Sequence, residues 1–265
     1  MIIGIGDERQ SIYGFRGATN ALSDFIELTN AGSLPMNISR RCSVAVVTEA
    51  NNVFEENPIQ SLPNAPIGAV STVEYDEFLR TVIDGDFVLC RTNLPLVKAC
   101  YSLLKRKVKA YILGRDIGFQ LIGLLKQLVK DNNTEDIAIL ATAAMESAKI
   151  NVKLLLSQNK DMEATSVMDR HESLLVFFEG CKTIAEIEEK IKETFKDNET
   201  SGVCLSTVHK IKGAESNNVY ILNPELMPHP KSRNPHEEKC IKFVAITRAK
   251  LNLYYVKENQ EKELE

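Results

Sequence analysis

The chain has 265 residues, of which 44% are hydrophobic and 26% charged, as is usual for a soluble globular fold. Its formal net charge of −4 argues against a protein that coats duplex DNA through electrostatics alone. No apolar run approaches the roughly 18–20 residues that cross a membrane, and the N-terminus lacks a signal peptide's basic start and apolar core. We therefore expect no membrane partner.

Cysteine and histidine usage predicts no metal centre. The six cysteines include no Cys-x-x-Cys pair, and the four histidines are scattered along the chain. Several of the cysteines lie inside apolar runs, as buried thiols do. We therefore expect a reducing cytoplasm as the setting of this protein.

The first apolar run, residues 2–5, predicts a short buried strand that ends in a loop with the sequence GDERQSIYGFRGA, residues 6–18. An aromatic face accepts any nucleic-acid base by stacking, worth about 1–3 kcal/mol each, and an arginine can pair with a phosphate. The loop therefore suits contact with a phosphate and a stacked base. In the alternative interpretation, Ile12, Tyr13 and Phe15 only pack under a turn. The pair Gly4 and Gly6 lacks the third glycine of a dinucleotide fingerprint.

Further along the chain, β-branched apolar runs alternate with helical patterns. Strands are predicted over 87–90, 110–113, 203–205, 219–222 and 251–256, and helices near 43–55, 95–107 and 237–248. Such alternation predicts an α/β parallel sheet with helices on both faces.

Residues 117–200 break this alternation, because they contain several helical patterns and no convincing strand. Thr183 and Glu186 form the pattern of a capping box before a helix, and Thr134 is a candidate cap for a helix through 139–140. We interpret the stretch as a small helical insertion, and the charged tail, 257–265, as a frayed end.

A run of basic residues without acidic ones lies between Arg91 and Arg115. Two interpretations stay open: a solvated helix face, which is the commoner case, and a local phosphate-binding track.

Four segments, taken together and in order, resemble motifs of the UvrD/Rep/PcrA-type superfamily 1 DNA helicases. Residues 6–18 resemble G-D-x-x-Q-S-I-Y-x-[FW]-R-G-A, and residues 37–51 resemble an N-Y-R-S motif followed by A-N. Residues 206–215 resemble T-[VL]-H-x-x-K-G-[LA]-E, and residues 237–250 resemble E-E-x-R-x-x-[YF]-V-[AG]-x-T-R-A-[KE]. The resemblance spans nearly the whole chain.

The resemblance implies a site for ATP with Mg²⁺. Three residues would clamp the γ-phosphate, with the last acting as an arginine finger: Gln10, Arg41 and Arg248. Three others would contact the rest of the nucleotide: Arg40, Gly213 and Glu215. Arg40 replaces the tyrosine that stacks on adenine in the family, although a guanidinium plane can also stack on a base.

The resemblance also implies a site for single-stranded DNA. Its residues would be Tyr13, Phe15, Arg16, Thr207 and His209, and movement would run from 3′ to 5′. The chain departs from the family pattern at Ser216, where an aromatic residue is usual, and at Lys239 and Cys240, where a basic pair is usual.

As a fold, the resemblance implies a RecA-like P-loop NTPase-type parallel sheet, the second of two motor domains, with an all-helical insertion. The expected division is 1–25 as a remnant of the first motor domain, 26–116 and 201–256 as the second, and 117–200 as the insertion. Neither G-x-x-x-x-G-K-[ST] nor D-E-x-Q occurs in the sequence. We therefore expect the C-terminal part of a helicase, inactive without an N-terminal motor domain as its partner.

Two alternatives remain at this stage. One is a catalytically inert module, derived from a helicase, that binds single strands or a partner protein. The other is the motor part of a helicase-nuclease, although only a short tail follows Arg248.

Overall fold

The computed structural model describes residues 2–14 and 21–257. Its main feature is a seven-stranded sheet in which every strand pairs in parallel with its neighbours. The predicted α/β parallel sheet is therefore confirmed. In sheet order the strands are β3 (Ala69–Glu74), β9 (Ala249–Lys257), β8 (Ser216–Leu222), β4 (Phe87–Cys90), β7 (Val203–Thr207), β5 (Ala110–Leu113) and β6 (Phe195–Lys196).

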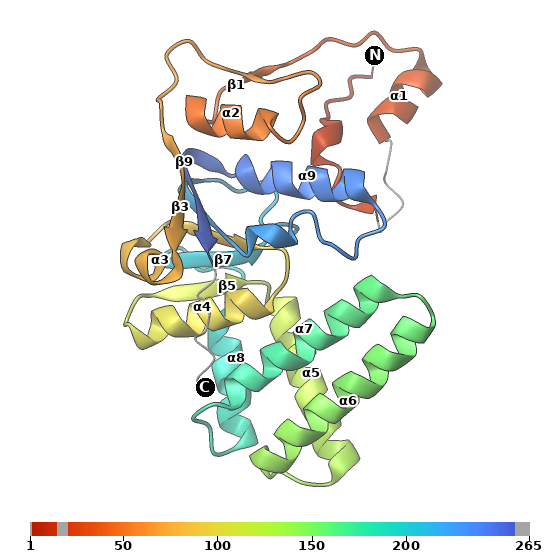
Figure 1. Ribbon diagram of the computed structural model, residues 1–265, viewed down its shortest axis with the longest axis vertical. Helices are drawn as coiled ribbons and strands as arrows, with labels where there is room; N and C mark the ends of the chain where they lie inside the picture. Colours follow the sequence, from red (N-terminus) through yellow and green to blue (C-terminus); the bar gives the residue numbers. More distant parts are fainter. Residues whose placement is uncertain (1, 15–20, 258–265) are drawn as a thin grey trace.

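Helices cover both faces of this sheet. Successive side chains of a strand point to opposite faces, and here the side chains on both faces belong to apolar clusters. In β4, Val88 and Cys90 belong to one core cluster and Leu89 belongs to the other. Helices α2 (Val44–Asn51) and α9 (Pro235–Ile246) pack on one face. Helices α3 (Tyr75–Thr81) and α4 (Leu94–Lys105) pack on the other (Figure 1).

Four consecutive helices form a helical block beside the second face: α5 (Arg115–Asn132), α6 (Ile137–Ser157), α7 (Asp161–Phe178) and α8 (Ile184–Thr194) (Figure 1). Leu125 of α5, Leu140 of α6 and Leu174 of α7 are fully buried in the same apolar cluster as Val88 of the sheet. The helical block and the sheet therefore share one continuous core.

The N-terminal segment differs from its prediction. Residues 2–5 form no strand among the described residues, and Ile2, Ile3 and Ile5 are exposed. The prediction of a buried strand here was wrong for a physical reason, since a strand needs a neighbour for its backbone hydrogen bonds. The short helix η1 (Glu8–Gln10) follows, and Ile12 then enters the core beside α9 with no exposed surface.

Other elements of this region are small. Helix α1 (Ala21–Thr29) has no buried residue, and β1 (Ile38–Ser39) pairs in parallel with β2 (Gln60–Ser61). A short turn, η3 (Pro224–Leu226), follows β8.

Two predicted helix caps have different outcomes. Thr183 is the N-cap of α8, and its hydroxyl accepts a hydrogen bond from the backbone N–H of Glu186 at 3.2 Å, as predicted. The cap of α6 is Asp136 instead of Thr134, because the Asp136 carboxylate accepts from Ala138 N and Ile139 N. Thr134 instead accepts a hydrogen bond from Asp136 N.

The basic run between 91 and 115 consists largely of ion-paired side chains. Lys105 pairs with Glu179, and Lys109 pairs with Glu199. Arg106 lies 3.7 Å from an oxygen of Asp76. This pairing favours the solvated, ion-paired surface over a dedicated phosphate track.

The shared core predicts how α6 contributes to stability. Leu140→Ala should lower the free energy of unfolding by about 2–5 kcal/mol, because it leaves a cavity in the cluster that joins α6 to the sheet. Leu154→Ala on the same helix is the matched control, since Leu154 is 55% exposed and its loss should cost no more than about 0.5 kcal/mol. Urea unfolding followed by circular dichroism measures both values, and equal losses would contradict the shared core.

Candidate functional site at two edges of the sheet

All seven strands run in one direction, so every residue just before a strand lies at one edge of the sheet and every residue just after lies at the opposite edge. Glu215 directly precedes β8, and Arg248 directly precedes the adjacent strand β9. Thr207 ends β7, and Arg91 directly follows β4, which is its neighbour. The predicted site residues therefore separate into two clusters. We call the group with Glu215 and Arg248 the amino-edge cluster and the group with Thr207 the carboxyl-edge cluster.

In the amino-edge cluster, Arg248 is a buried arginine with 2% of its surface exposed. Its guanidinium donates to the carbonyl oxygens of Val244 and Ala214, at 3.0 and 3.1 Å, and to the hydroxyl of Thr247 at 3.3 Å. Burial lowers its pKa, and the charge of Arg41 acts in the same direction. A buried guanidinium held by neutral acceptors keeps its charge available to an incoming anion.

Arg41 and Glu215 form an ion pair beside this arginine, and Arg41 also donates to the carbonyl of Thr247 at 3.3 Å. Both side chains are more than a third exposed, so the pair is worth only about 0–1 kcal/mol and can open for a ligand. Arg40 is exposed next to Arg41. Gly213, with a φ of +100°, forms the turn before Glu215, a conformation that favours glycine.

Gln10 is not joined to the amino-edge cluster by any hydrogen bond that the structure shows. Its amide nitrogen donates to Asp7 at 3.0 Å, and its carbonyl oxygen accepts from Lys212 at 2.8 Å. The segment 7–14 instead lies along α9, where Gly14 N donates to Glu237 at 2.8 Å and the Arg9 guanidinium lies 5.1 Å from the Phe243 ring centre. The clamp of Gln10, Arg41 and Arg248 remains a prediction.

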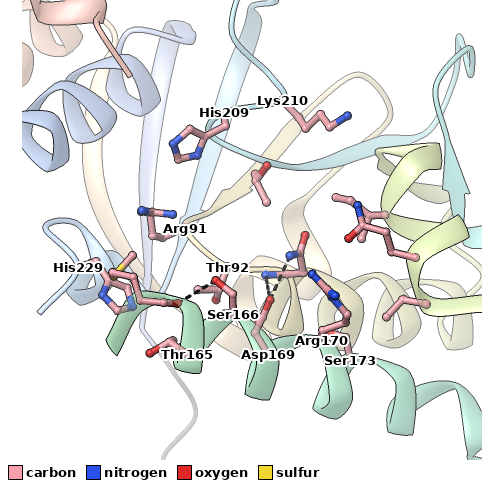
Figure 2. A pocket seen from close by; sticks show the side chains of 16 residues that line it. Arg91, Thr92, Thr165, Ser166, Asp169, Arg170, Ser173, His209, Lys210 and His229 are labelled. Atoms are coloured by element: carbon pink, nitrogen blue, oxygen red, sulfur yellow. Dashed lines mark hydrogen bonds between the residues drawn. The ribbon is translucent and has the colours of Figure 1, made fainter. Parts of the chain in front are cut away.

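A pocket of about 330 Å³ opens at the carboxyl edge, between the ends of β4 and β7 and the helices α5 and α7 (Figure 2). Thr207 and His209 line it, and both are implied to contact DNA. The Tyr13 hydroxyl donates to the carbonyl of His209 at 3.1 Å, which brings a third such residue to the same edge. Phe15 and Arg16, which complete the implied set, lie outside the described residues.

The imidazole of His209 is neutral at pH 7. Burial lowers its pKa to about 4, the Arg91 charge acts in the same direction, and Glu238 opposes them. A neutral ring offers one hydrogen-bond donor and one acceptor. His209 is therefore suited to polar groups of a base or sugar, more than to charge pairing with a phosphate.

The sequence did not predict a buried ion pair at the carboxyl edge, between Arg91 and Glu238. The Arg91 guanidinium forms two hydrogen bonds with the Glu238 carboxylate, at 2.9 and 3.2 Å, and Glu238 is 2% exposed. The backbone N–H of His229 donates to the same carboxylate at 3.0 Å. Removing one partner of such a pair typically costs about 3–5 kcal/mol. The pair thus fixes α9 against the end of β4.

A second missed contact joins the helical block to helix α4. The Asp169 carboxylate on α7 accepts from the backbone N–H groups of Asn93 and Leu94, at 3.1 and 2.8 Å, and from the Asn93 side chain at 3.1 Å. These N–H groups lie at the start of α4, where a negative charge is favourable. No sequence pattern pointed to this pairing, since the partners are 75 residues apart.

The described residues contain no candidate metal centre and no candidate membrane span. Within 2–14 and 21–257, no group of three or more His, Cys, Asp or Glu side chains is placed to hold a metal ion. In the same ranges, no helix combines the length and the apolar character needed to span a membrane.

The parallel sheet, with a buried arginine at one edge and a pocket at the other, is accompanied by a match to a known family. The model of the UvrD-like helicase C-terminal domain matches residues 120–260. The chain therefore belongs to the UvrD-like helicase C-terminal domain family.

Individual relatives agree with this assignment. F-box DNA helicase protein 1 of Schizosaccharomyces pombe is 26% identical over 276 residues, covering 95% of this chain and 30% of the relative. ATP-dependent DNA helicase PcrA of Staphylococcus aureus is 36% identical over 112 residues, covering 39% of this chain and 14% of the relative. The chain thus spans less than a third of the length of these curated relatives.

One solved structure matches only loosely. It is described as the C-terminal domain of a possible DNA helicase from Lactobacillus plantarum WCFS1, with a TM-score of 0.35 and 10% sequence identity. The match covers 82% of this chain and 87% of that one.

The lowered pKa of His209 predicts a pH dependence of stability. Between the folded pKa of about 4 and the ordinary value of 6.5, the unfolded chain binds a proton that the folded chain does not, so stability falls as the pH drops. Going from pH 7 to pH 5 should cost about 1–2 kcal/mol. Urea titrations at the two pH values measure this cost.

His209→Asn should reduce the pH dependence. It should not remove it, because burial also lowers the pKa of His229 in the same direction. A variant that keeps the full difference between pH 7 and pH 5 would contradict the assignment to His209.

Proposed function

We propose that this chain is the C-terminal part of an ATP-dependent DNA helicase. In this proposal the enzyme moves along single-stranded DNA from 3′ to 5′, the direction that the resemblance implies, and unwinds duplex DNA in replication, repair or recombination. The observation that carries the proposal is the separation of two clusters across one sheet, with Arg41, Glu215 and Arg248 at the amino edge and Thr207 and His209 at the carboxyl edge.

The amino-edge cluster fits the triphosphate of ATP. Arg248 holds a desolvated positive charge, and Arg41 can supply a second when its exposed pair with Glu215 opens. The Glu215 carboxylate released in this way can accept from ribose hydroxyls. Two guanidinium groups stabilise the charge that spreads over a transferred phosphoryl group, which is the main task of catalysis in this reaction.

The ligands for Mg²⁺ and the phosphate-binding lysine must come from elsewhere in the proposed enzyme. No G-x-x-x-x-G-K-[ST] occurs in the sequence, and acidic clusters suited to a metal are absent from the described residues. We assign these parts to a first motor domain, whose remnant would be residues 1–25. The second motor domain would comprise 26–116 and 201–256, with 117–200 as its insertion.

The carboxyl-edge cluster fits a single strand of DNA. Thr207 and His209 line a pocket at the ends of β4 and β7, and Tyr13 is hydrogen-bonded to the same loop. The Tyr13 ring provides a surface on which a base can stack. Because the loop 207–215 joins β7 to β8, it links this cluster directly to Glu215 at the nucleotide edge.

A second candidate is a module that binds single strands or a partner protein without turning over ATP. The missing P-loop motif favours it. The amino-edge cluster opposes it, because a module that binds no nucleotide has no use for a buried arginine held only by neutral acceptors.

The purified 265-residue chain should not hydrolyse ATP, either alone or with single-stranded DNA, because it lacks the lysine and the metal ligands that hold the phosphates. A phosphate-release assay with and without an oligonucleotide measures this. A single cooperative urea transition serves as the control for folding. DNA-stimulated phosphate release would contradict the proposed division of the active site.

In a protein that carries this chain together with a P-loop motor domain, Arg248→Ala should lower kcat by about 10³-fold. Binding of ATP should change far less, because the finger acts mainly on charge developed in the transition state. Arg248→Lys should also be slow, since an ammonium group cannot reproduce the planar fork of donors.

The matched control is Arg233→Ala, which removes an exposed arginine paired with Asp161 outside both clusters. It should leave kcat unchanged. Near-normal turnover in a folded Arg248→Ala enzyme would refute the role of Arg248.

A further inference from the structure

One wall of the carboxyl-edge pocket comes from the helical block and not from any of the four motifs. Gln120 of α5 lies on it, together with Met162, Thr165, Arg170 and Ser173 of α7. Figure 2 shows Thr165, Asp169 and Arg170 on α7, with Arg91 and His209 across the cavity. The pocket therefore lies between the predicted DNA residues and the helical block.

Two polar atoms in this pocket lack partners among the described residues. They are two buried atoms of residues that line the pocket: the hydroxyl oxygen of Ser173, a residue that is 1% exposed, and the side-chain oxygen of Asn93. A buried polar group without a hydrogen bond is energetically unfavourable. A ligand that carries both donors and acceptors would recover this cost.

The charged side chains around the pocket differ in whether they already have a partner of opposite charge. Arg91 is paired with Glu238, and Lys210 is paired with Asp116. The Asp169 carboxylate is occupied by the N–H groups at the start of α4. Arg170 is exposed, and no acidic side chain of the described residues lies within 4 Å of it, so its charge is available for a phosphate.

We propose that the helical block forms the second wall of the single-strand site, and that this pocket takes one nucleotide of the strand. The inference rests on the proposed function. Arg170 pairs with the phosphate, while Asn93 and Ser173 hydrogen-bond to the edge of the base. The volume of about 330 Å³ lies at the small end of ligand sites, as one nucleotide unit requires.

Among the described residues, no Phe, Tyr or Trp side chain lines this pocket, and its only rings are the imidazoles of His209 and His229. The base is therefore held by hydrogen bonds and by apolar contact with Ile117, Leu121 and Met162, in contrast to stacking on Tyr13. Contacts to base edges discriminate among bases, whereas stacking does not. The pocket thus gives the strand site a preference for particular bases.

The test is fluorescence anisotropy with the 265-residue chain and a labelled 20-nucleotide oligo(dT) over a series of salt concentrations. Arg170→Ala should raise Kd by about 3-fold or more and lower the slope of log K against log salt by about one. Arg80→Ala, which removes an exposed arginine on α3, is the matched control and should change neither quantity.

Ser173→Ala, which removes the hydroxyl and adds no bulk at this buried position, tests the base contact separately. It should weaken binding to the normal oligonucleotide and should leave binding to an abasic oligonucleotide unchanged. Urea midpoints close to that of the parent chain show that the variants are folded.

The outcomes separate the two proposals. If His209→Ala weakens binding while Arg170→Ala and Ser173→Ala do not, the second wall is refuted and the proposed function stands. If the parent chain binds no oligonucleotide even at low salt, both proposals fail.

Discussion

The common direction of the seven strands is the constraint on which the rest of this structure depends. It places every loop that precedes a strand at one edge and every loop that follows a strand at the other. Short stretches of chain therefore reach both edges. Residues 207–215 run from the end of β7 to the start of β8, and so from the pocket to the ion pair of Glu215 with Arg41. No separate element is needed to connect the two clusters.

Helix α9 depends on the buried pair of Arg91 and Glu238 for its position at the carboxyl edge, and its other end leads directly into Thr247 and Arg248. The same charges influence the pKa of His209, where Arg91 acts with burial to keep the ring neutral. One buried ion pair thus orients a helix that carries an arginine at the amino edge, and it also sets the electrostatic environment of a histidine at the other edge.

Local patterns were sufficient for much of the fold. The apolar runs at 87–90 and 219–222 became strands because a strand covered on both faces is apolar throughout. Strand β3 was missed because most of its side chains are exposed and its sequence, AVSTVE, has no continuous apolar run. The strand expected at 2–5 failed for the opposite reason, since an apolar run does not supply its own hydrogen-bonding neighbour.

The candidate site was predictable only where a single segment carried the pattern. The strand-end residues Thr207 and His209 were found in this way and do line one pocket. The contacts of Glu238 with Arg91 and of Asp169 with Asn93 could not be found, because they join residues 147 and 76 positions apart. Such pairs depend on tertiary packing, about which periodicity and motif spacing carry no information.

Ile12 anchors the N-terminal segment in the apolar core that contains α9. Its side chain is wholly buried beside α9, although residues 2–6 are exposed. Withdrawing an isoleucine from a core costs about 1.5–3 kcal/mol. Ile12 is thus a packing link, by way of α9, between the N-terminal segment and the loop that carries the amino-edge arginine.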